Sequence, residues 1–530
     1  MISAGRVIFA QTTSATTLRP LARRYLSNAA TSPYRVAIVG SGPSGFYVSH
    51  RLLEKFTKAL ADSSEEATPT KDLRIDIFEK LPVPYGLSRY GVAPDHPEVK
   101  NCQDTFDGVM QSPQVRFFGN VQVASAGGAT AGVSIDALRD KYHAVVFSYG
   151  CDEDNTLGID GEDHPGVIPA RKFVGWYNGL PEFRSLNPPL DQVENVVIVG
   201  NGNVALDVAR ILLASPEKHW ASTDITSDSV KKLIASTVKN VSIVARRGYY
   251  ESAFTNKEFR ELLDLSTASK QTESLVKFNG IDEFLIESMK HLIPQMGRVH
   301  KRRLDMYRKY QKDQEAFRAK NGESSLSAAK QWSLKYMLSP FKFISHPTNP
   351  ILLQSTICHQ NVLSVPVSAD EPVLVRKTEE TETLKSELVI TSIGYKGSPL
   401  PGFSENNISF DAQRGVIRNV DGRVLAASAK ANAGERCIKG LYTSGWIKNG
   451  PKGVIATTML DAFLVGDLIL HDLANGRLKT PKDEAFGSEN AVSADEWYKI
   501  DAEEKKRGED CGKPREKIVL IDEMMRVAKN

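Results

Sequence analysis

The chain has 530 residues, of which 41% are hydrophobic, and a formal net charge of +3. This length is enough for two or three domain cores. No apolar stretch in the sequence reaches the length of a membrane span, which argues against a membrane-spanning protein and predicts a soluble or at most peripherally bound one.

The first 33 residues differ from the rest in composition. Ser, Thr and Ala are frequent, and the first acidic residue is Glu54. The only charged residues are four arginines, Arg6, Arg19, Arg23 and Arg24. This composition predicts a mitochondrial transit peptide over residues 1–33, with a disordered tail as the alternative. Cleavage near Tyr25 would remove these four charges from the net charge of +3 and leave −1, so a partner attracted by charge must recognise a local patch.

A short β-forming run from Tyr34 leads into the glycine-rich string GSGPSG, and a helical pattern begins directly after it. Gly40 permits a tight turn, Gly42 lets the backbone approach a pyrophosphate, and Gly45 lets the helix lie close to the strand. The helix N-terminus then offers unpaired N–H groups to phosphates. The pattern predicts a dinucleotide-binding unit.

The next segments supply candidate ligand contacts. Residues 57–71 are polar and predict a surface insertion. The alternating string RIDIFEK then contains Glu79, where a carboxylate would bind a ribose diol, although a solvated strand end is the alternative. Residues 81–101 are rich in Pro and Gly and predict a loop that lines a ligand site. His96 in this loop either exchanges protons near a redox ring or merely packs the loop.

A second copy of the motif lies at residues 193–213, where Gly200, Gly202 and Ala205 take the small-residue positions. The strand that follows ends in Arg246 and Arg247 instead of an acid. An acid would repel a 2′-phosphate, whereas guanidinium groups pair with it. The first unit is therefore predicted to bind FAD and the second NADPH. The alternative is that the two arginines are only solvated.

Residues 256–337 are charged and are predicted to be helical, with a basic run over 297–312. This run is either a solvated helix face or a docking surface for an acidic protein. Nucleic-acid binding is the least favoured, because stacking aromatic residues are missing.

An apolar strand at 387–397 predicts the return to the first domain. Within residues 440–470 a strand, a glycine-rich turn and a helix starting near Gly453 offer a second helix N-terminus to a ring or a phosphate. Trp446 either covers a flavin or belongs to the core.

Eight strings then point to one family: GSGPSGFY, VPYGLSRYGVAPDHPEVKN, FVGWYNGLP, GNGNVALDVARILL, ARRG, SIGYK, SGWIKNGPKGVI and GKPREK. Through them the chain resembles the adrenodoxin reductase family of mitochondrial ferredoxin reductases over nearly all of residues 34–530. The resemblance implies an α/β fold with two Rossmann-like domains, in which an NADP domain (151–386) is inserted into a discontinuous FAD domain (34–150 and 387–530).

The resemblance also implies site residues. Around FAD it places Gly40, Gly42, Ser44, Gly45, Glu79, Leu87, Val123, Trp446, Gly453, Val454 and Ile455. Around NADPH it places Asn201, Gly202, Asn203, Val204, Arg246, Arg247 and Glu258, with Gly453 near the nicotinamide. Catalytic roles in proton transfer or coupling map to His96 and to Asp207, which otherwise reads as a helical acid beside Arg210.

The activity that the resemblance implies is FAD-dependent NADPH:ferredoxin oxidoreduction in the mitochondrial matrix or on the matrix side of the inner membrane. Electrons would pass to a two-iron, two-sulfur ferredoxin that serves iron–sulfur cluster assembly, haem modification, or sterol or quinone hydroxylation. The implied docking face consists of basic residues, namely Arg298, Lys301, Arg302 and Arg303. No metal site and no nucleic-acid partner are expected.

Three other classes of protein are alternatives to this expectation. A pyridine nucleotide–disulfide reductase needs a dithiol near the flavin, and a glutamate-synthase-like subunit needs cysteine-bound clusters. The five cysteines are widely spaced and form no such motif: Cys102, Cys151, Cys358, Cys437 and Cys511. A non-enzymatic scaffold or RNA-binding flavoprotein would rest on the basic run alone.

Overall fold

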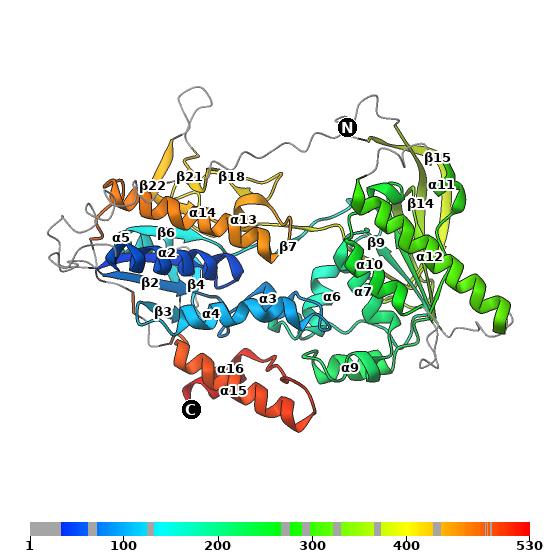
Figure 1. Cartoon of the computed structure of the whole chain (residues 1–530), viewed down its shortest axis with the longest axis horizontal. Helices are drawn as coiled ribbons and strands as arrows, with labels where there is room; N and C mark the ends of the chain where they lie inside the picture. Colours follow the sequence, from blue (N-terminus) through cyan, green and yellow to red (C-terminus); the bar gives the residue numbers. More distant parts are fainter. Residues whose placement is uncertain are drawn as a thin grey trace.

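The computed structural model describes residues 33–61, 72–124, 132–266, 276–288, 297–321, 330–364, 373–427, 436–482, 484, 486–487 and 490–530. Residues 1–32 of the expected transit peptide lie outside the described residues, as do residues 62–71 of the expected insertion. In Figure 1 the chain forms two α/β units, one on each side of the view.

The first unit is built on a seven-stranded sheet with the order β20-β21-β22-β6-β1-β2-β3. At its centre β1 (Tyr34–Val39) pairs in parallel with β2 (Leu73–Phe78) and β6 (Ala144–Phe147). Late in the chain, β22 (Cys437–Thr443) adds to β6, also in parallel. The other strands are β3 (Val115–Phe118), β20 (Asn419–Val420) and β21 (Arg423–Leu425). Distant segments of the chain thus share one sheet.

Helices cover the faces of this sheet. On one face α2 (Pro43–Ala61) and α14 (Ile455–Ala474) pack along each other (Figure 1). Their apolar side chains, among them Phe46, Leu52 and Val465, are buried against β1 and β2. The shorter elements of this unit are α3 (Leu87–Tyr90), η1 (Pro97–Asn101), α4 (Cys102–Met110), β4 (Gln122–Ala124), β5 (Gly132–Ser134), α5 (Ile135–Lys141), β18 (Phe410–Asp411), β19 (Val416–Ile417) and α13 (Trp446–Asn449).

The second unit contains a parallel six-stranded sheet with the order β11-β12-β10-β9-β16-β8. Its strands are β8 (Val167–Pro169), β9 (Asn195–Val199), β10 (Asn240–Val244), β11 (Val276–Phe278), β12 (Lys330–Lys335) and β16 (Leu388–Thr391). Its helical elements are α6 (Ala170–Tyr177), η2 (Pro181–Phe183), α7 (Asn203–Leu213), α8 (Pro216–His219), α9 (Ser227–Ile234), η3 (Tyr249–Glu251), α10 (Asn256–Asp264), α11 (Glu283–Ser288) and α12 (Arg298–Asn321). An antiparallel sheet of β13 (Leu338–Ser345), β14 (Leu353–Leu363) and β15 (Val375–Lys385) lies beside it.

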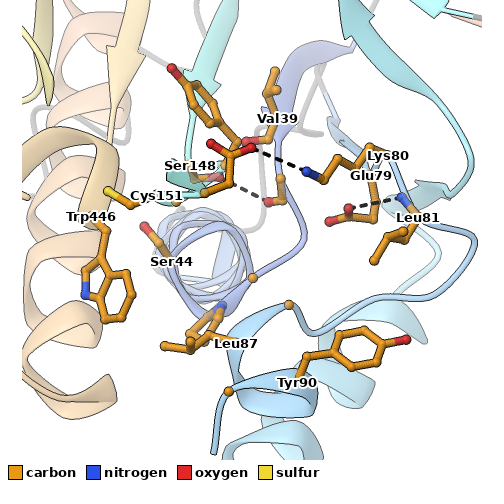
Figure 2. Close-up of a pocket in the computed structure, with 18 of the residues that line it drawn as sticks. Val39, Ser44, Glu79, Lys80, Leu81, Leu87, Tyr90, Ser148, Cys151 and Trp446 are labelled. Atoms are coloured by element: carbon orange, nitrogen blue, oxygen red, sulfur yellow. Dashed lines mark hydrogen bonds and ion pairs between the residues drawn. The ribbon is translucent and has the colours of Figure 1, made fainter. Parts of the chain in front are cut away.

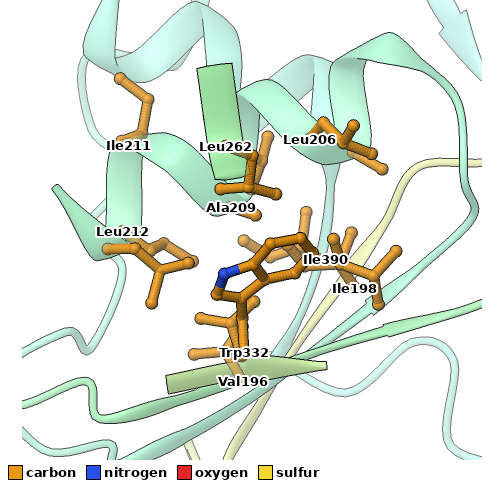
Figure 3. Close-up of a cluster of buried hydrophobic side chains, with 14 of the residues drawn as sticks. Val196, Ile198, Leu206, Ala209, Ile211, Leu212, Leu262, Trp332 and Ile390 are labelled. Carbon is orange, nitrogen blue, oxygen red and sulfur yellow. The ribbon is translucent and has the colours of Figure 1, made fainter. Parts of the chain in front are cut away.

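The helical prediction for residues 256–337 is wrong at β11 and β12. Trp332 on β12 is buried between β9 and the helices α7 and α10 (Figure 3). Because β12 pairs in parallel with β10, tertiary pairing overrides the local helical pattern.

The boundary expected at residue 387 also differs from the structure. β16 pairs with β9 and β8 inside the second sheet, and Ile390 belongs to the core drawn in Figure 3. The two crossings between the units lie slightly further along, where β7 (Glu153–Asp154) pairs with β17 (Tyr395–Lys396). We therefore propose this two-stranded ribbon as the domain boundary.

The chain ends in two helices, α15 (Ala494–Asp510) and α16 (Ile521–Lys529), which pack below the first unit (Figure 1). Between them, residues 511–520 pass next to α9 of the second unit. In the part of the chain that the structure describes, no helix is both long and apolar enough to cross a membrane.

Candidate active site

A cavity of about 330 Å³ lies at the carboxyl ends of the strands of the first sheet. Gly40, Glu79 and Ser148 follow β1, β2 and β6, and all three line it. Figure 2 shows Trp446 on one side, Glu79 on the other and Ser44 between them. In open α/β sheets ligands bind at this edge, and the volume falls in the roughly 300–1,000 Å³ range of small-molecule sites.

The glycine turn has the geometry that a dinucleotide needs. Gly40 has a φ of +103°, and an added Cβ would lie 2.6 Å from the Cα of Tyr149. At Gly45 a Cβ would lie 2.2 Å from the carbonyl oxygen of Gly40, so the helix can approach β1 only because this residue is glycine. Gly42 instead lines the cavity, and apart from its neighbours in the chain no described residue has an atom within 4 Å of the place of its Cβ. This open space suits a pyrophosphate against the start of α2.

Glu79 is held next to the glycine turn. Its carboxylate accepts hydrogen bonds from the backbone N–H of Ser41 (3.0 Å) and from the Ser41 hydroxyl (2.7 Å). The other carboxylate oxygen accepts from the N–H of Leu81 (3.2 Å). Since Glu79 also lines the cavity, its oxygens are placed to accept hydrogen bonds from a ribose diol.

Most of the predicted FAD residues line the cavity: Gly40, Gly42, Ser44, Glu79, Leu87, Val123, Trp446 and Ile455. The other three do not. Gly45 lies behind the turn against β1, while Gly453 and Val454 precede α14 and are exposed. At Gly453 φ is +83°, which suits the glycine at this turn before the helix.

The second site lies at the corresponding edge of the second sheet. The N–H of Gly200 donates to the carbonyl of Val244 (2.8 Å), and a Cβ at Gly200 would lie 2.1 Å from the carbonyl oxygen of Ser392. At Gly202, as at Gly42, no described residue apart from the neighbours in the chain has an atom within 4 Å of the place of the Cβ. The turn at Asn201, Gly202 and Asn203 therefore leaves room at the N-terminus of α7.

The other predicted NADPH residues surround this turn. The side-chain oxygen of Asn203 accepts from the N–H of Thr255 (2.8 Å), and the Thr255 hydroxyl donates to Glu258. Arg246 and Arg247 have exposed side chains, while their carbonyls are bonded to Asn361 and Met337. The loop is thus fixed while both guanidinium groups face solvent, so the residues fit a 2′-phosphorylated nucleotide.

A charged cluster lies where the two units meet. Arg210 on α7 makes two hydrogen bonds to Asp95 (2.7 and 2.9 Å) and ion pairs with Asp207 (3.0 Å) and Glu261 (3.4 Å). Glu261 on α10 also contacts Nε2 of His96 (2.7 Å). His96 and Asp207 therefore belong to one network of hydrogen bonds and ion pairs, although neither residue lines the cavity of the first unit.

Comparison with known proteins shows to which family the chain belongs. No family model matches it. The mitochondrial NADPH:adrenodoxin oxidoreductase of Homo sapiens is 39% identical over 502 residues, which cover 93% of this chain and 91% of the human protein. The chain belongs to the NADPH:adrenodoxin oxidoreductase family.

Two further similar proteins support the family resemblance that the sequence motifs indicate. The probable NADPH:adrenodoxin oxidoreductase of Schizosaccharomyces pombe is 38% identical over 85% of this chain and 84% of its own length. The solved structure of Mycobacterium tuberculosis FprA in complex with NADPH is 33% identical, has a TM-score of 0.77 and covers 94% of this chain and all of its own. The expected family and the α/β fold class are confirmed.

Several residues that line the cavity are not predicted by the sequence analysis, namely Tyr90, Ser148, Tyr149, Gly150, Arg171, Val174, Gly175 and Tyr395. Ser148 to Gly150 directly follow a strand next to β1, so the rule that ligands bind at carboxyl ends would have found them. Arg171, Val174 and Gly175 come from α6 of the second unit. Val174 and Gly175 lie in the family string FVGWYNGLP, but nothing in that string indicates that it reaches the cavity of the other unit.

The prediction that Arg303 belongs to an exposed docking face is wrong. Arg303 is only 3% exposed and donates hydrogen bonds to the carbonyls of Ser252 (3.1 Å) and Phe254 (2.6 Å). Its guanidinium also lies over the Phe254 ring at 4.7 Å. Arg303 therefore anchors α12 to the loop before α10. Arg298, Lys301 and Arg302 on the same helix are exposed.

The cavity contains no pair of cysteines among its lining residues. Cys151 lines it, and burial raises the pKa of this thiol to about 12. A thiol that stays protonated near neutral pH, with no second cysteine beside it, does not fit the dithiol chemistry of a disulfide reductase.

Asp207 should give the enzyme a pH-dependent step. Burial raises its pKa from 3.8 to about 6, against the opposing charges of Arg210 and His96. Between these two pH values the folded chain binds the extra proton, so the contribution of this group lowers the free energy of unfolding as pH rises. We expect an inflection near pH 6 in kcat/KM for NADPH that Asp207→Asn removes. In the control Asp305→Asn, at an exposed position of α12, the inflection should remain.

Proposed function

We propose that this chain is an FAD-dependent NADPH:ferredoxin oxidoreductase of mitochondria. The observation that carries the proposal is the pair of nucleotide sites with opposite charge: Glu79 beside the first glycine turn, and Arg246 and Arg247 beside the second. The names of the relatives support the same activity and compartment. The arginine-rich start of the sequence supports import into the matrix.

The first cavity would hold FAD. The glycine turn and the start of α2 would bind its pyrophosphate, and Glu79 would accept from its ribose. Trp446 and Ile455 line the opposite end, next to the N-terminus of α14. Bound FAD supplies the ability to take two electrons from a nicotinamide and release them singly. The protein's contribution would be to hold FAD in a cavity that residues of both units line.

The second site would hold NADPH. The N-terminus of α7, with Asn201 to Val204, would face its pyrophosphate, while Arg246 and Arg247 would pair with the 2′-phosphate. Glu258 lies at the first turn of α10, fixed to Asn203 through Thr255. Arg171 on α6 lines the first cavity, so the unit that would hold NADPH contributes to the wall of the proposed FAD site.

The junction network would position the units and hold protons near the site. His96 is 7% exposed and is bonded to Glu261, so its ring orientation is fixed by a carboxylate of the other unit. Asp207 is placed in the same network by Arg210. A proton held on either residue alters the charge at the junction, and this is the role we propose for the pair.

The acidic ferredoxin would dock on the exposed cations of α12. Arg298, Lys301 and Arg302 lie at the start of this helix, where the carbonyl of Val299 accepts from Asn256 of α10 (3.0 Å). This contact puts the positive patch next to the proposed NADPH edge. Complementary charge of this kind steers a partner and weakens with salt.

Changing all three of these residues to glutamine should therefore raise KM for ferredoxin roughly tenfold or more at low salt, because each exposed charge contributes about 0.5–1 kcal/mol. The kinetics with a small artificial acceptor should not change. Lys231→Gln, at an exposed position of α9, serves as the control. An unchanged KM with a retained salt dependence would show that the partner docks elsewhere.

Anaerobic reduction tests the proposed function at the first step. NADPH should bleach the visible absorption of the FAD-loaded protein in a single fast phase, and NADH should do so much more slowly. Two equivalents of an oxidised two-iron, two-sulfur ferredoxin, each of which accepts one electron, should then restore the oxidised flavin spectrum. A reduced protein that ferredoxin does not reoxidise would overturn the proposal.

A further inference from the structure

The segment between α15 and α16 connects the two units. On the side of the first unit, Glu504 is fully buried and accepts from Arg89 (2.6 Å), from Arg515 (3.1 Å) and from the N–H of Ile518 (2.9 Å). On the side of the second unit, Glu516 accepts from the N–H (2.9 Å) and the hydroxyl (2.7 Å) of Ser227, the first residue of α9. The segment is thus anchored at both ends.

A buried ion triad lies in the middle of this connection. Asp224 of the second unit pairs with Lys517 of the C-terminal segment (3.0 Å) and with Lys100 of the first unit (2.5 Å). The side chains of Lys517, Asp224 and Lys100 are only 0%, 12% and 15% exposed. One carboxylate thus holds two ammonium groups from the other side of the junction, away from competing water.

One member of the triad, Lys517, also lies over a residue that lines the cofactor cavity. The ammonium of Lys517 lies 6.0 Å from the ring centre of Tyr90, and the guanidinium of Arg89 lies 5.1 Å from it. Tyr90 is 5% exposed and lines the cavity, where Figure 2 shows it near Leu87. A cation over an aromatic face is attractive, and more so when desolvated.

We propose that Lys517 is a positioning residue that fixes the second unit against the first through Asp224 and at the same time fixes Tyr90 as a wall of the cofactor cavity. The C-terminal segment would then set how the NADPH-binding edge faces the flavin. The expected effect on turnover rests on the proposed function, whereas the effects on cofactor retention and on the mobility of α9 do not.

The charges around Lys517 also predict how the contact responds to pH. Burial lowers the pKa of Lys517 to about 7, Asp224 opposes this shift, and Lys100 and Arg89 add to it. Burial raises the pKa of Tyr90, so the ring stays neutral. As pH rises above 7, Lys517 loses its charge and with it the attraction to Asp224 and to the ring. The coupling between the units should therefore weaken in that range.

Three variants test the proposal in the full-length holoprotein. In Lys517→Met we expect at least a tenfold slower reduction of flavin by NADPH, faster release of FAD and faster amide exchange at residues 227–234. In Lys517→Arg, which keeps its charge at high pH, reduction should stay fast above pH 7, where the wild type slows. Lys529→Met, which breaks an ion pair to Glu496 within the first unit, is the control.

Asp224→Asn provides a second route if Lys517→Met does not fold. This variant leaves both lysines in place and should loosen α9 while reduction by NADPH slows. If Lys517→Met and Asp224→Asn match Lys529→Met in FAD release, amide exchange and pH profile, the proposal is overturned. If FAD release and exchange change but neither variant nor wild type reduces ferredoxin, the positioning role stands and the proposed function fails.

Discussion

Replacing Arg246 by alanine should lower the preference for NADPH over NADH by about 1.5–3 kcal/mol, which is the contribution of one charged hydrogen bond. The side chain is exposed just after β10, while its carbonyl accepts a hydrogen bond from Asn361, so the substitution would remove the proposed contact with the 2′-phosphate and leave the loop in place. Measurement of kcat/KM for both coenzymes gives the result directly. The value for NADPH should fall and the value for NADH should stay nearly constant.

Two further variants make this result specific. Arg247→Ala should show a similar change if both arginines pair with the 2′-phosphate. Arg260→Ala, at an exposed position of α10 in the same unit, should leave the preference unchanged. Equal losses for NADPH and NADH in Arg246→Ala would contradict the assignment of this residue to the phosphate.

Replacing Glu504 by alanine should cost about 3–5 kcal/mol of stability, because it leaves the buried Arg89 without its partner. Both side chains are almost inaccessible to solvent, at 0% and 3%, and Nη2 of Arg89 contacts both carboxylate oxygens (2.6 and 2.7 Å). The loss should appear as a lower midpoint of thermal unfolding and as release of the C-terminal helices to proteolysis before the rest of the chain.

The matched control is Asp467→Asn, which breaks the ion pair of Asp467 with Arg51 between α14 and α2. The Asp467 side chain is 42% exposed, so we expect a loss of at most about 1 kcal/mol. Similar losses in the two variants would mean that burial does not distinguish these pairs. A Glu504→Ala protein as stable as the wild type would contradict the anchoring of the C-terminal segment.

The sequence was sufficient to predict what depends on local pattern. The glycines at 40, 42 and 45 lie between a strand and a helix, and the structure gives them the expected geometry. Glu79 and Arg246 could be located because each follows the strand that comes next after the glycine turn and helix of its unit. Their roles toward the cofactors stay predictions.

Features that depend on tertiary contacts were harder to predict. β12 was expected to be helical, because its pairing with β10 is not encoded in local periodicity. β16 is followed by the glycine-containing string SIGYKG, which is similar to the SYG that follows β6 in the first sheet. β16 nevertheless pairs with β9 in the second sheet. Arg303 lies in a basic run on a helix, and only its packing against Phe254 distinguishes it from its exposed neighbours.

Contacts that join residues of the two units cannot be assigned from a single sequence. Glu261 is one acid among several on α10, but it is the one that bonds His96. Arg171 on α6 lines the cavity of the first unit although it is far along the chain from the glycine turn of that cavity. Such residues become visible only when the two units are seen together.

The most direct test of the whole account is NADPH-dependent cytochrome c reduction by the mature holoprotein, with and without a mitochondrial two-iron, two-sulfur ferredoxin, at low and high salt. We expect reduction to depend strongly on ferredoxin and to weaken as salt screens the docking charges. Rapid NADPH oxidation that ferredoxin does not affect at either salt concentration would contradict the account and would point to a different electron acceptor.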